Sequence, residues 1–147
     1  MRPAFAGIGF GNAGVHLPHG MSYPVSGGVR SYVAEGYPAD HPLVPHGMAV
    51  VLNAPAVFRF TAPADPARHL LAARLMGAET SGARPEDAGE ILAATIAGLM
   101  RRTGMPNGLA ALGYTAADVD MLVAGTLPQH RVTKLSPCTA GPDDLRQ

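Results

Sequence analysis

Six histidines are the side chains of this 147-residue sequence best suited to chemistry, and four of them fall within residues 16–46. The six are His16, His19, His41, His46, His69 and His130. Imidazole is the commonest protein ligand for zinc and for iron-like ions. Spacing alone leaves two interpretations open, a metal site or histidines that are buried or cap a turn. His16 and His19 are three apart, but they have neither the glutamate of an HExxH helix nor a cysteine partner.

A helix must position the first two of these histidines. Residues 5–24 read FAGIGFGNAGVHLPHGMSYP, and on an ideal helix His16, His19 and Tyr23 share one face. Small residues fill much of the rest and let another backbone approach closely, which predicts a central, tightly packed helix. Each of the two prolines follows a glycine by four residues, and a helical proline collides with the carbonyl four residues back. We therefore expect a bent helix over residues 3–27 whose irregular stretch includes His19.

Four further helices are expected from apolar spacing and from capping residues. Residues 45–61 are apolar almost all round, which is typical of a buried helix, and Pro55 is expected to kink it. The others are expected over residues 65–77, 85–102 and 115–125. The inward-facing residues of the 65–77 helix are expected to be Leu70, Leu71 and Leu75. Strand signals are weak throughout, so the predicted fold class is all-α, without a hairpin or a βαβ unit.

The composition fits one domain and excludes several classes of function. Hydrophobic residues make up 47% of the chain and charged residues 15%, which is too apolar for a disordered protein. Eleven basic residues balance eleven acidic ones and tryptophan is absent, so nothing favours nucleic acid or an anionic membrane. Cys138 is the only cysteine, and no adjacent histidine or lysine suggests a nucleophile. Because no apolar run suits a bilayer and no signal-peptide pattern is present, we expect a soluble intracellular domain.

Two segments of the sequence carry a family resemblance. GNAGVHLPHGMSYPVSG and DHPLVPHGMAVVL place one histidine, His19, before Gly-Met and a second, His46, in Pro-His-Gly. This pattern resembles the signature of the iron-containing alcohol dehydrogenases. Many members have a further histidine four residues after the first, where this chain has Tyr23. That variant, with Pro-Val-Ser-Gly after it, is similar to the hydroxyacid-oxoacid transhydrogenase branch. The resemblance continues through NAPAVFRFTA, GLAALGYTAADV and GTLPQHRVTKL and covers nearly the whole chain.

The resemblance implies a two-domain oxidoreductase with a dehydroquinate synthase-like fold. In that fold an N-terminal α/β domain binds NAD, and a C-terminal helical domain, matching residues 1–147, holds a divalent metal, iron or zinc. The resemblance implies that His19 and His46 are metal ligands and that Tyr23 is a candidate catalytic residue. The family's other two ligands, an Asp and a His four apart on a helix, are absent from this sequence, as is the glycine-rich phosphate loop. The domain is therefore expected to be incomplete at both ends and inactive alone.

The branch also implies a reaction. 4-Hydroxybutyrate would be oxidised to succinate semialdehyde while 2-oxoglutarate is reduced to 2-hydroxyglutarate, with bound NAD carrying the hydride. A homo-oligomer is implied for the complete protein, in the cytoplasm of a bacterium or the mitochondrion of a eukaryote. Two alternatives stay open: an iron-containing alcohol dehydrogenase acting on other substrates, and an inactive helical module that binds a metal or a partner.

Four residues each have two alternative roles. His16 either lines the site or is a satisfied buried histidine. Tyr23 either orients the substrate oxygen or is a packing tyrosine. Arg30 and Lys134 lie outside the strongly predicted helices, so each either binds a substrate carboxylate or is a solvated surface charge. Capping or surface positions are expected for His41, His69 and His130.

Overall fold

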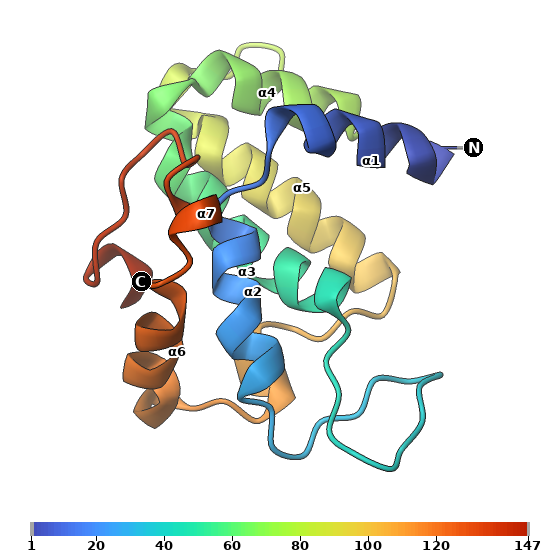
Figure 1. Cartoon of the computed structure of the whole chain (residues 1–147). Coiled ribbons are helices and arrows are strands. Elements are labelled where there is room, and N and C mark those ends of the chain that lie inside the picture. Colours follow the sequence, from blue (N-terminus) through green and yellow to red (C-terminus); the bar gives the residue numbers. More distant parts are fainter. Residues whose placement is uncertain (1, 147) are drawn as a thin grey trace.

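The chain folds into helices joined by turns and loops (Figure 1). The computed structural model describes residues 2–146. Its α-helices are α1 (Arg2–Ala13), α2 (Leu17–Gly27), α3 (His46–Thr61), α4 (Pro66–Leu75), α5 (Ala88–Arg102), α6 (Val119–Thr126) and α7 (His130–Thr133). Short 3₁₀ turns are η1 (Ala62–Ala64), η2 (Pro85–Asp87), η3 (Leu109–Leu112), η4 (Ala116–Asp118) and η5 (Asp144–Arg146). An isolated bridge between Val33 and Leu43 is the only strand-like pairing among the described residues, so the all-α fold class is confirmed. Across residues 2–146, none of the helices combines the length and hydropathy needed to cross a bilayer.

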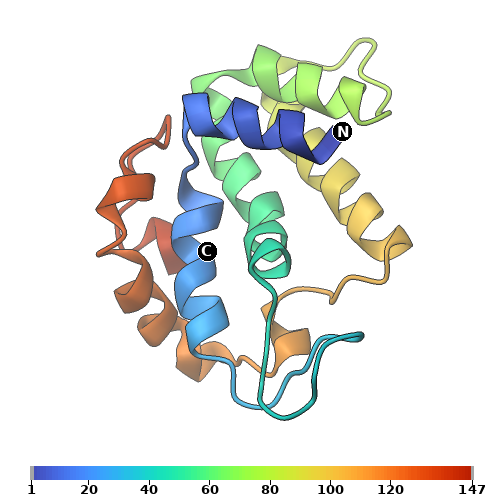
Figure 2. The ribbon, with the colours of Figure 1, turned by 45° about the vertical axis from the view of Figure 1, so that its right-hand side comes forward.

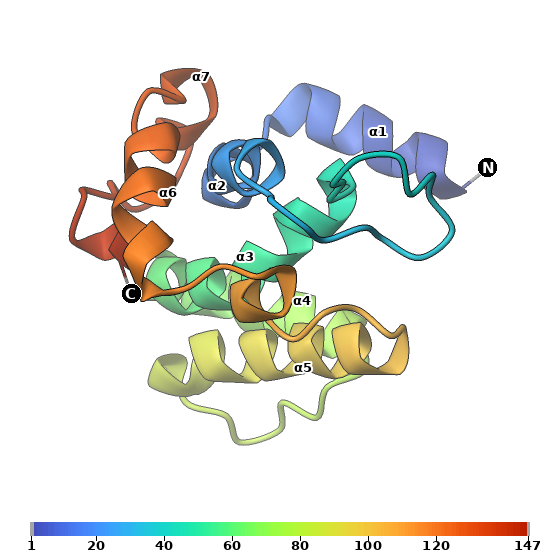
Figure 3. The same cartoon turned by 90° about the horizontal axis from the view of Figure 1, so that it is seen from below.

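Helix α3 is the centre of the bundle. Figure 2 shows α6, α2, α3 and α5 side by side in that order, and the view from below in Figure 3 again places α3 between α2 and α5. The inward side of α3 carries Ala49, Leu52 and Ala54, which are buried in one core cluster with Val25 of α2 and Ile96 of α5. Each large aliphatic side chain removed from water in this way contributes about 2 kcal/mol to stability. The helix continues through Pro55 to its end.

The N-terminal segment forms two helices rather than one bent helix. Helix α1 ends where the Gly14 N–H donates to the Phe10 carbonyl, and Gly14 itself has a positive φ of 78°. Pro18 lies in the first turn of α2, where its missing N–H leaves no helical bond unmade. The ring would collide with the carbonyl of residue 14 in a continuous helix, so the chain breaks at residues 14–16 instead. The expectation that His19 lies in the irregular stretch was therefore wrong, because His19 lies in the first regular turn of α2.

The predicted tight packing holds for α2 and not for α1. A Cβ added to Gly20 of α2 would lie 2.7 Å from Cγ2 of Thr133, so any larger residue would force Thr133 to move. Helix α1, by contrast, leaves Phe5, Ile8 and Phe10 exposed by 70%, 62% and 57%. The small residues of α1 make no comparable approach to another element, so this part of the prediction was wrong.

Helix α4 presents a different face from the one predicted. Asp65 caps it by accepting from the Arg68 N–H at 3.0 Å, and this cap fixes where the helix begins. His69 and Ala73 then point inward, whereas Leu71 and Leu75 are exposed by 44% and 78%. The prediction that Leu71 and Leu75 face inward was wrong, and so was a surface position for His69. Small Ala73, which is fully buried, lets α4 lie close against α5.

The remaining helix ends fall where the sequence predicted. The run η2–α5 covers residues 85–102, and Gly104 after it has a positive φ of 70°. Gly77 after α4 has a positive φ of 95°. The Thr115 N–H donates to a carboxylate oxygen of Asp118 at 2.8 Å, which completes a capping box at η4.

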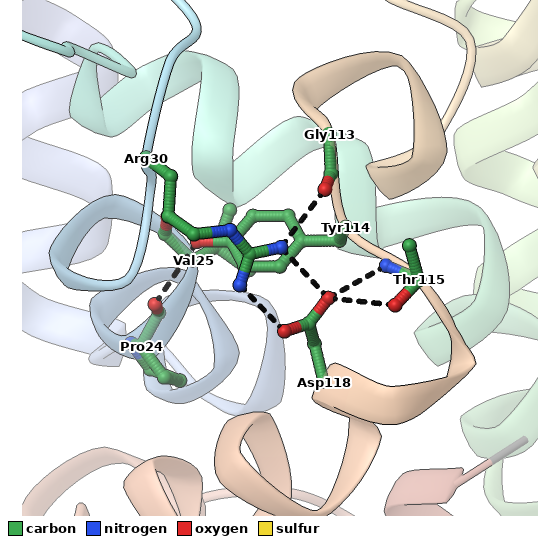
Figure 4. A network of polar contacts seen from close by, with 7 residues as sticks. All are labelled: Pro24, Val25, Arg30, Gly113, Tyr114, Thr115 and Asp118. Carbon is green, nitrogen blue, oxygen red and sulfur yellow. Dashed lines mark hydrogen bonds and ion pairs between the residues drawn. The ribbon is translucent and has the colours of Figure 1, made fainter.

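A polar network fastens the C-terminal end of α2 to residues 113–118 (Figure 4). The Arg30 guanidinium donates to both carboxylate oxygens of Asp118, at 2.6 and 2.9 Å, and to the Gly113 carbonyl at 3.0 Å. It also lies 5.7 Å from the ring centre of Tyr114, whose hydroxyl donates to the Val25 carbonyl at 2.6 Å. Carbonyls in the last turn of a helix have no partner within the helix, so Tyr114 satisfies one of them from outside.

The charge of Asp118 is stabilised within this network. Hydrogen bonding from the Arg30 side chain, joined by the Thr115 N–H, holds the pKa of the Asp118 carboxyl well below its usual value. A carboxyl whose pKa is depressed by folding stabilises the fold above its unfolded pKa, about 3.9. That contribution is lost as the pH falls through the folded-state pKa.

Asp118→Asn is expected to unfold at a lower urea concentration than the wild type at pH 7, because the variant lacks the charged partner of Arg30. The gap between the two midpoints should narrow as the pH falls below about 4, because Asp118 of the unfolded wild-type chain then takes up a proton that the folded chain resists. Urea titrations followed by circular dichroism measure both. Asp143→Asn is the matched control, since Asp143 also pairs with an arginine at 3.0 Å but its side chain is 99% exposed. A gap that does not vary with pH would contradict this account.

Candidate metal centre

Helices α2 and α3 bring together the three site residues named from the sequence. His19 and Tyr23 lie one turn apart on α2, and His46 is the first residue of α3. The ring centroids of His19 and His46 are 5.4 Å apart, with 64° between the ring planes. The Tyr23 ring stacks on His46 at 6.1 Å and 25°. His19 is half-buried, whereas His46 and Tyr23 lie at the surface.

The loop between the two helices returns His46 to α2. The Leu43 N–H donates to the Tyr32 carbonyl at 2.8 Å, and the Val33–Leu43 bridge lies beside this bond. The next residue, Val44, is buried, and its carbonyl accepts from the Ser26 hydroxyl of α2 at 3.3 Å. Pro45 then holds an extended conformation, at φ −57° and ψ 141°, directly before α3 begins. These contacts fix where the first turn of α3 meets α2.

Electrostatics favours the neutral form of the half-buried histidines. Burial lowers the pKa of His19, and the neighbouring His46 lowers it further. Burial also lowers the pKa of His16, with smaller effects from His19 and His69. A metal needs the free lone pair of an unprotonated ring nitrogen. The environment of His19 therefore suits a metal ligand at neutral pH.

Ser22 is a polar residue of the site that the sequence analysis missed. It is fully buried on α2, and its hydroxyl donates to the His19 carbonyl at 2.7 Å. The same Oγ lies 3.4 Å from Nδ1 of His46. Its place three residues after His19 on a helix was the available signal, because residues three apart share a helix face.

An apolar cavity of about 580 Å³ opens beside His19. Its wall is formed largely by Val50, Val51, Phe58, Ile96, Leu99 and Met100. His16 also lines the cavity, with its ring edge-on to Phe58 at 6.3 Å. Within residues 2–146, the buried Nδ1 of His16 has no hydrogen-bond partner. Among these residues, His16 is therefore not a satisfied buried histidine.

The other candidates lie away from the histidine pair. Arg30 is held by Asp118, and Lys134 is exposed near the C-terminal turns. His41 is exposed and pairs with neighbouring Asp40 at 2.8 Å. His69 is buried, with Nε2 3.0 Å from the Thr61 hydroxyl oxygen and Nδ1 2.8 Å from the Asp65 carbonyl. The partly buried Cys138 and the exposed His130 belong to the C-terminal segment.

Within the described residues, no further ligand joins His19 and His46. Within residues 2–146, no group of three or more His, Cys, Asp or Glu side chains could hold a metal ion. Two imidazoles alone leave most of a metal's coordination positions open, since catalytic zinc sites normally have three protein ligands.

Known proteins resemble this chain in sequence and in fold. Residues 3–147 match the Fe-containing alcohol dehydrogenase family, C-terminal. The human mitochondrial hydroxyacid-oxoacid transhydrogenase is 59% identical over 145 residues, which are 99% of this chain and 31% of that protein. A probable mitochondrial hydroxyacid-oxoacid transhydrogenase from Dictyostelium discoideum is 57% identical over 146 residues, 99% of this chain and 27% of that protein. An alcohol dehydrogenase from Oenococcus oeni superposes with a TM-score of 0.80 at 26% identity, over 96% of this chain and 33% of that one.

The extent of these matches also defines which region of the relatives the chain represents. The chain spans about a third of the length of the curated relatives it matches. The family match names the C-terminal region, and it leaves out only the first two residues. The helical fold agrees with that of the solved alcohol dehydrogenase. The chain therefore belongs to the iron-containing alcohol dehydrogenase family, as the helical C-terminal region of that fold.

Proposed function

We propose that this chain is the metal-holding helical part of a hydroxyacid-oxoacid transhydrogenase. The observation that carries the proposal is the approach of His19 to His46, at 5.4 Å between ring centroids, with Tyr23 stacked on the second ring. The similarity to mitochondrial transhydrogenases supports the choice of reaction within the family. In that reaction 4-hydroxybutyrate loses a hydride and a proton to give succinate semialdehyde. 2-Oxoglutarate gains a hydride and a proton to give 2-hydroxyglutarate, and NAD carries the hydride between them.

His19 and His46 are the proposed ligands of a divalent zinc or iron ion. The donor set fits such an ion, because imidazole suits both metals and the surroundings of His19 favour its neutral form. A bound divalent ion supplies Lewis-acid polarisation of a substrate oxygen. Remaining ligands, and the NAD site, are proposed to come from the rest of the parent enzyme.

Tyr23 is the proposed residue that orients the substrate. Tyr23 is 38% exposed and its ring lies against His46, so the residue is open to a molecule at the histidine pair. A phenol both donates and accepts a hydrogen bond. It can therefore hold a substrate hydroxyl or carbonyl oxygen at a fixed place beside the two imidazoles.

The apolar surfaces next to the site are proposed to receive the rest of the parent enzyme. The 580 Å³ cavity beside His19 is almost wholly apolar, and α1 exposes Phe5, Ile8 and Phe10. Apolar surface of this extent marks an interaction site more often than free surface. The curated relatives are about three times as long as this chain, which supports docking of their remaining residues here.

Removing either proposed ligand should weaken metal binding. His19→Ala and His46→Ala are each expected to lower the affinity of the 147-residue chain for Zn²⁺ by about tenfold or more. Removing an outer-shell partner of a ligand already costs about tenfold, and removing the ligand itself should cost at least as much. Isothermal titration with Zn²⁺ at pH 7.5 measures this. His130→Ala is the matched control, because His130 is exposed and lies away from the pair. Equal losses in all three variants would contradict the site.

Turnover is expected to require the rest of the parent enzyme. Residues 1–147 mixed with NAD, Zn²⁺ or Fe²⁺, 4-hydroxybutyrate and 2-oxoglutarate are expected to form no succinate semialdehyde or 2-hydroxyglutarate. Two ligands leave the metal incompletely held, and within the described residues no nucleotide-binding sheet is present. Chromatography of the products measures both half-reactions even when the reduced cofactor stays bound.

Adding the separately expressed remainder of the parent enzyme is expected to restore turnover, and His19→Ala in this chain should abolish it. Turnover by residues 1–147 alone that disappears on His19→Ala would contradict the proposal, because the chain would then be a complete enzyme.

A further inference from the structure

The hydroxyl of Ser22 lies between the two histidines of the candidate metal centre. Ser22 is fully buried on α2. Its Oγ lies 2.7 Å from the His19 carbonyl oxygen and 3.4 Å from Nδ1 of His46. One side chain therefore connects the backbone of one histidine with the ring of the other.

The chemistry of these groups fixes the direction of both hydrogen bonds. A serine hydroxyl has one hydrogen to donate, and a carbonyl oxygen can only accept. The Ser22 hydrogen is therefore directed to the His19 carbonyl, the shorter of the two contacts. Nδ1 of His46 then faces a lone pair of Oγ, and this contact is favourable when Nδ1 carries a hydrogen.

A neutral imidazole carries its single hydrogen on one nitrogen, and the hydrogen bond made there determines which nitrogen is free. With the hydrogen on Nδ1, the lone pair of His46 is on Nε2. Ordinary solvated histidine prefers the opposite tautomer, with the hydrogen on Nε2. Ser22 therefore acts against the intrinsic preference of this ring.

We propose that Ser22 is a positioning residue, which selects the Nδ1–H tautomer of His46 and so presents Nε2 as the nitrogen that binds the metal. The tautomer part of this inference rests on contacts within the chain, and only the metal part rests on the proposed function. Ser22 also orders the pair as a unit, because its donor bond is to the backbone of His19. Outer-shell partners of this kind orient a ligating histidine and fix its tautomer.

The tautomer is measured directly by two-bond ¹H–¹⁵N NMR of the metal-free chain at about pH 8.5, two units above the ordinary histidine pKa. The Nδ1–H form of His46 is expected in the wild type and the Nε2–H form in Ser22→Ala. Thr95→Ala is the matched control, because Thr95 lies on α5 and its hydroxyl also donates to a backbone carbonyl of its own helix, that of Ile91 at 2.6 Å. It should keep the wild-type tautomer.

A second variant keeps the test decisive if Ser22→Ala fails to fold. Ser22→Thr retains the hydroxyl, so it is expected to keep the Nδ1–H tautomer, and far-ultraviolet circular dichroism reports the helix content of every variant. If Ser22→Ala loses its helix content, the comparison of Ser22→Thr with the wild type decides. The inference would be overturned by an Nε2–H tautomer of His46 in the wild type or in a well-folded Ser22→Thr variant. It would also be overturned if His46 had the same tautomer in all the proteins.

Metal titration then separates this inference from the proposed function. Zn²⁺ affinity is expected to fall by about 10- to 100-fold in Ser22→Ala and to change less than about twofold in Thr95→Ala. A wild-type chain that shows the Nδ1–H tautomer but binds no Zn²⁺ would overturn the proposed metal site and leave the tautomer assignment standing. Equal Zn²⁺ affinities of the wild type and Ser22→Ala would overturn the role of Ser22 towards the metal.

Discussion

The packing of α2 between α3 on one side and α6 with α7 on the other is the contact on which the candidate metal centre depends. His19 and His46 come from different helices, so their separation is set by how closely α2 meets α3. On the opposite face, a Cβ on Gly20 would lie 2.7 Å from Cγ2 of Thr133, and one on Gly125 would lie 2.6 Å from Cβ of Pro24. Because both positions are glycine, the neighbouring elements pack closely on α2 and hold it against α3. The approach of the two histidines is a consequence of this packing.

Much of the fold could be predicted because the residues that begin and end its helices act through local chemistry. Pro85, Gly104 and the Thr115–Asp118 pair mark helix ends through their own backbone and capping chemistry, and the structure has helix ends at those places. The facing of α4 could not be predicted in the same way. Apolar spacing favours Leu71 and Leu75 as inward residues, yet the core contact with α5 uses Ala73 and leaves both leucines exposed. Which face is buried depends on tertiary packing, which local spacing does not contain.

For the site, the family resemblance went further than the spacing of the histidines. His19, His46 and Tyr23 were named from a family resemblance, and the structure brings their rings together. Spacing by itself favoured buried or capping histidines over a metal site. The supporting contacts were beyond reach of the sequence, because Ser22 meets His46 only after the loop of residues 28–45 has folded back on α2. His69 was likewise misassigned, since its hydrogen bonds to Thr61 and Asp65 depend on the turn that joins α3 to α4.

The Arg30–Asp118 ion pair has a consequence for the order in which the fold is completed during synthesis. Its two residues are 88 apart in the chain, whereas His19 and His46 lie on consecutive helices joined by the loop of residues 28–45. A ribosome releases residues in order, so α2 and α3 emerge before residues 113–118 are synthesised and before α6 and α7 are present to pack on α2. Until Tyr114 emerges, the Val25 carbonyl lacks the hydroxyl that satisfies it in the finished fold. The histidine pair is therefore completed only when the last third of the chain has been made, because that third supplies both the partner of Arg30 and the helices that pack on α2.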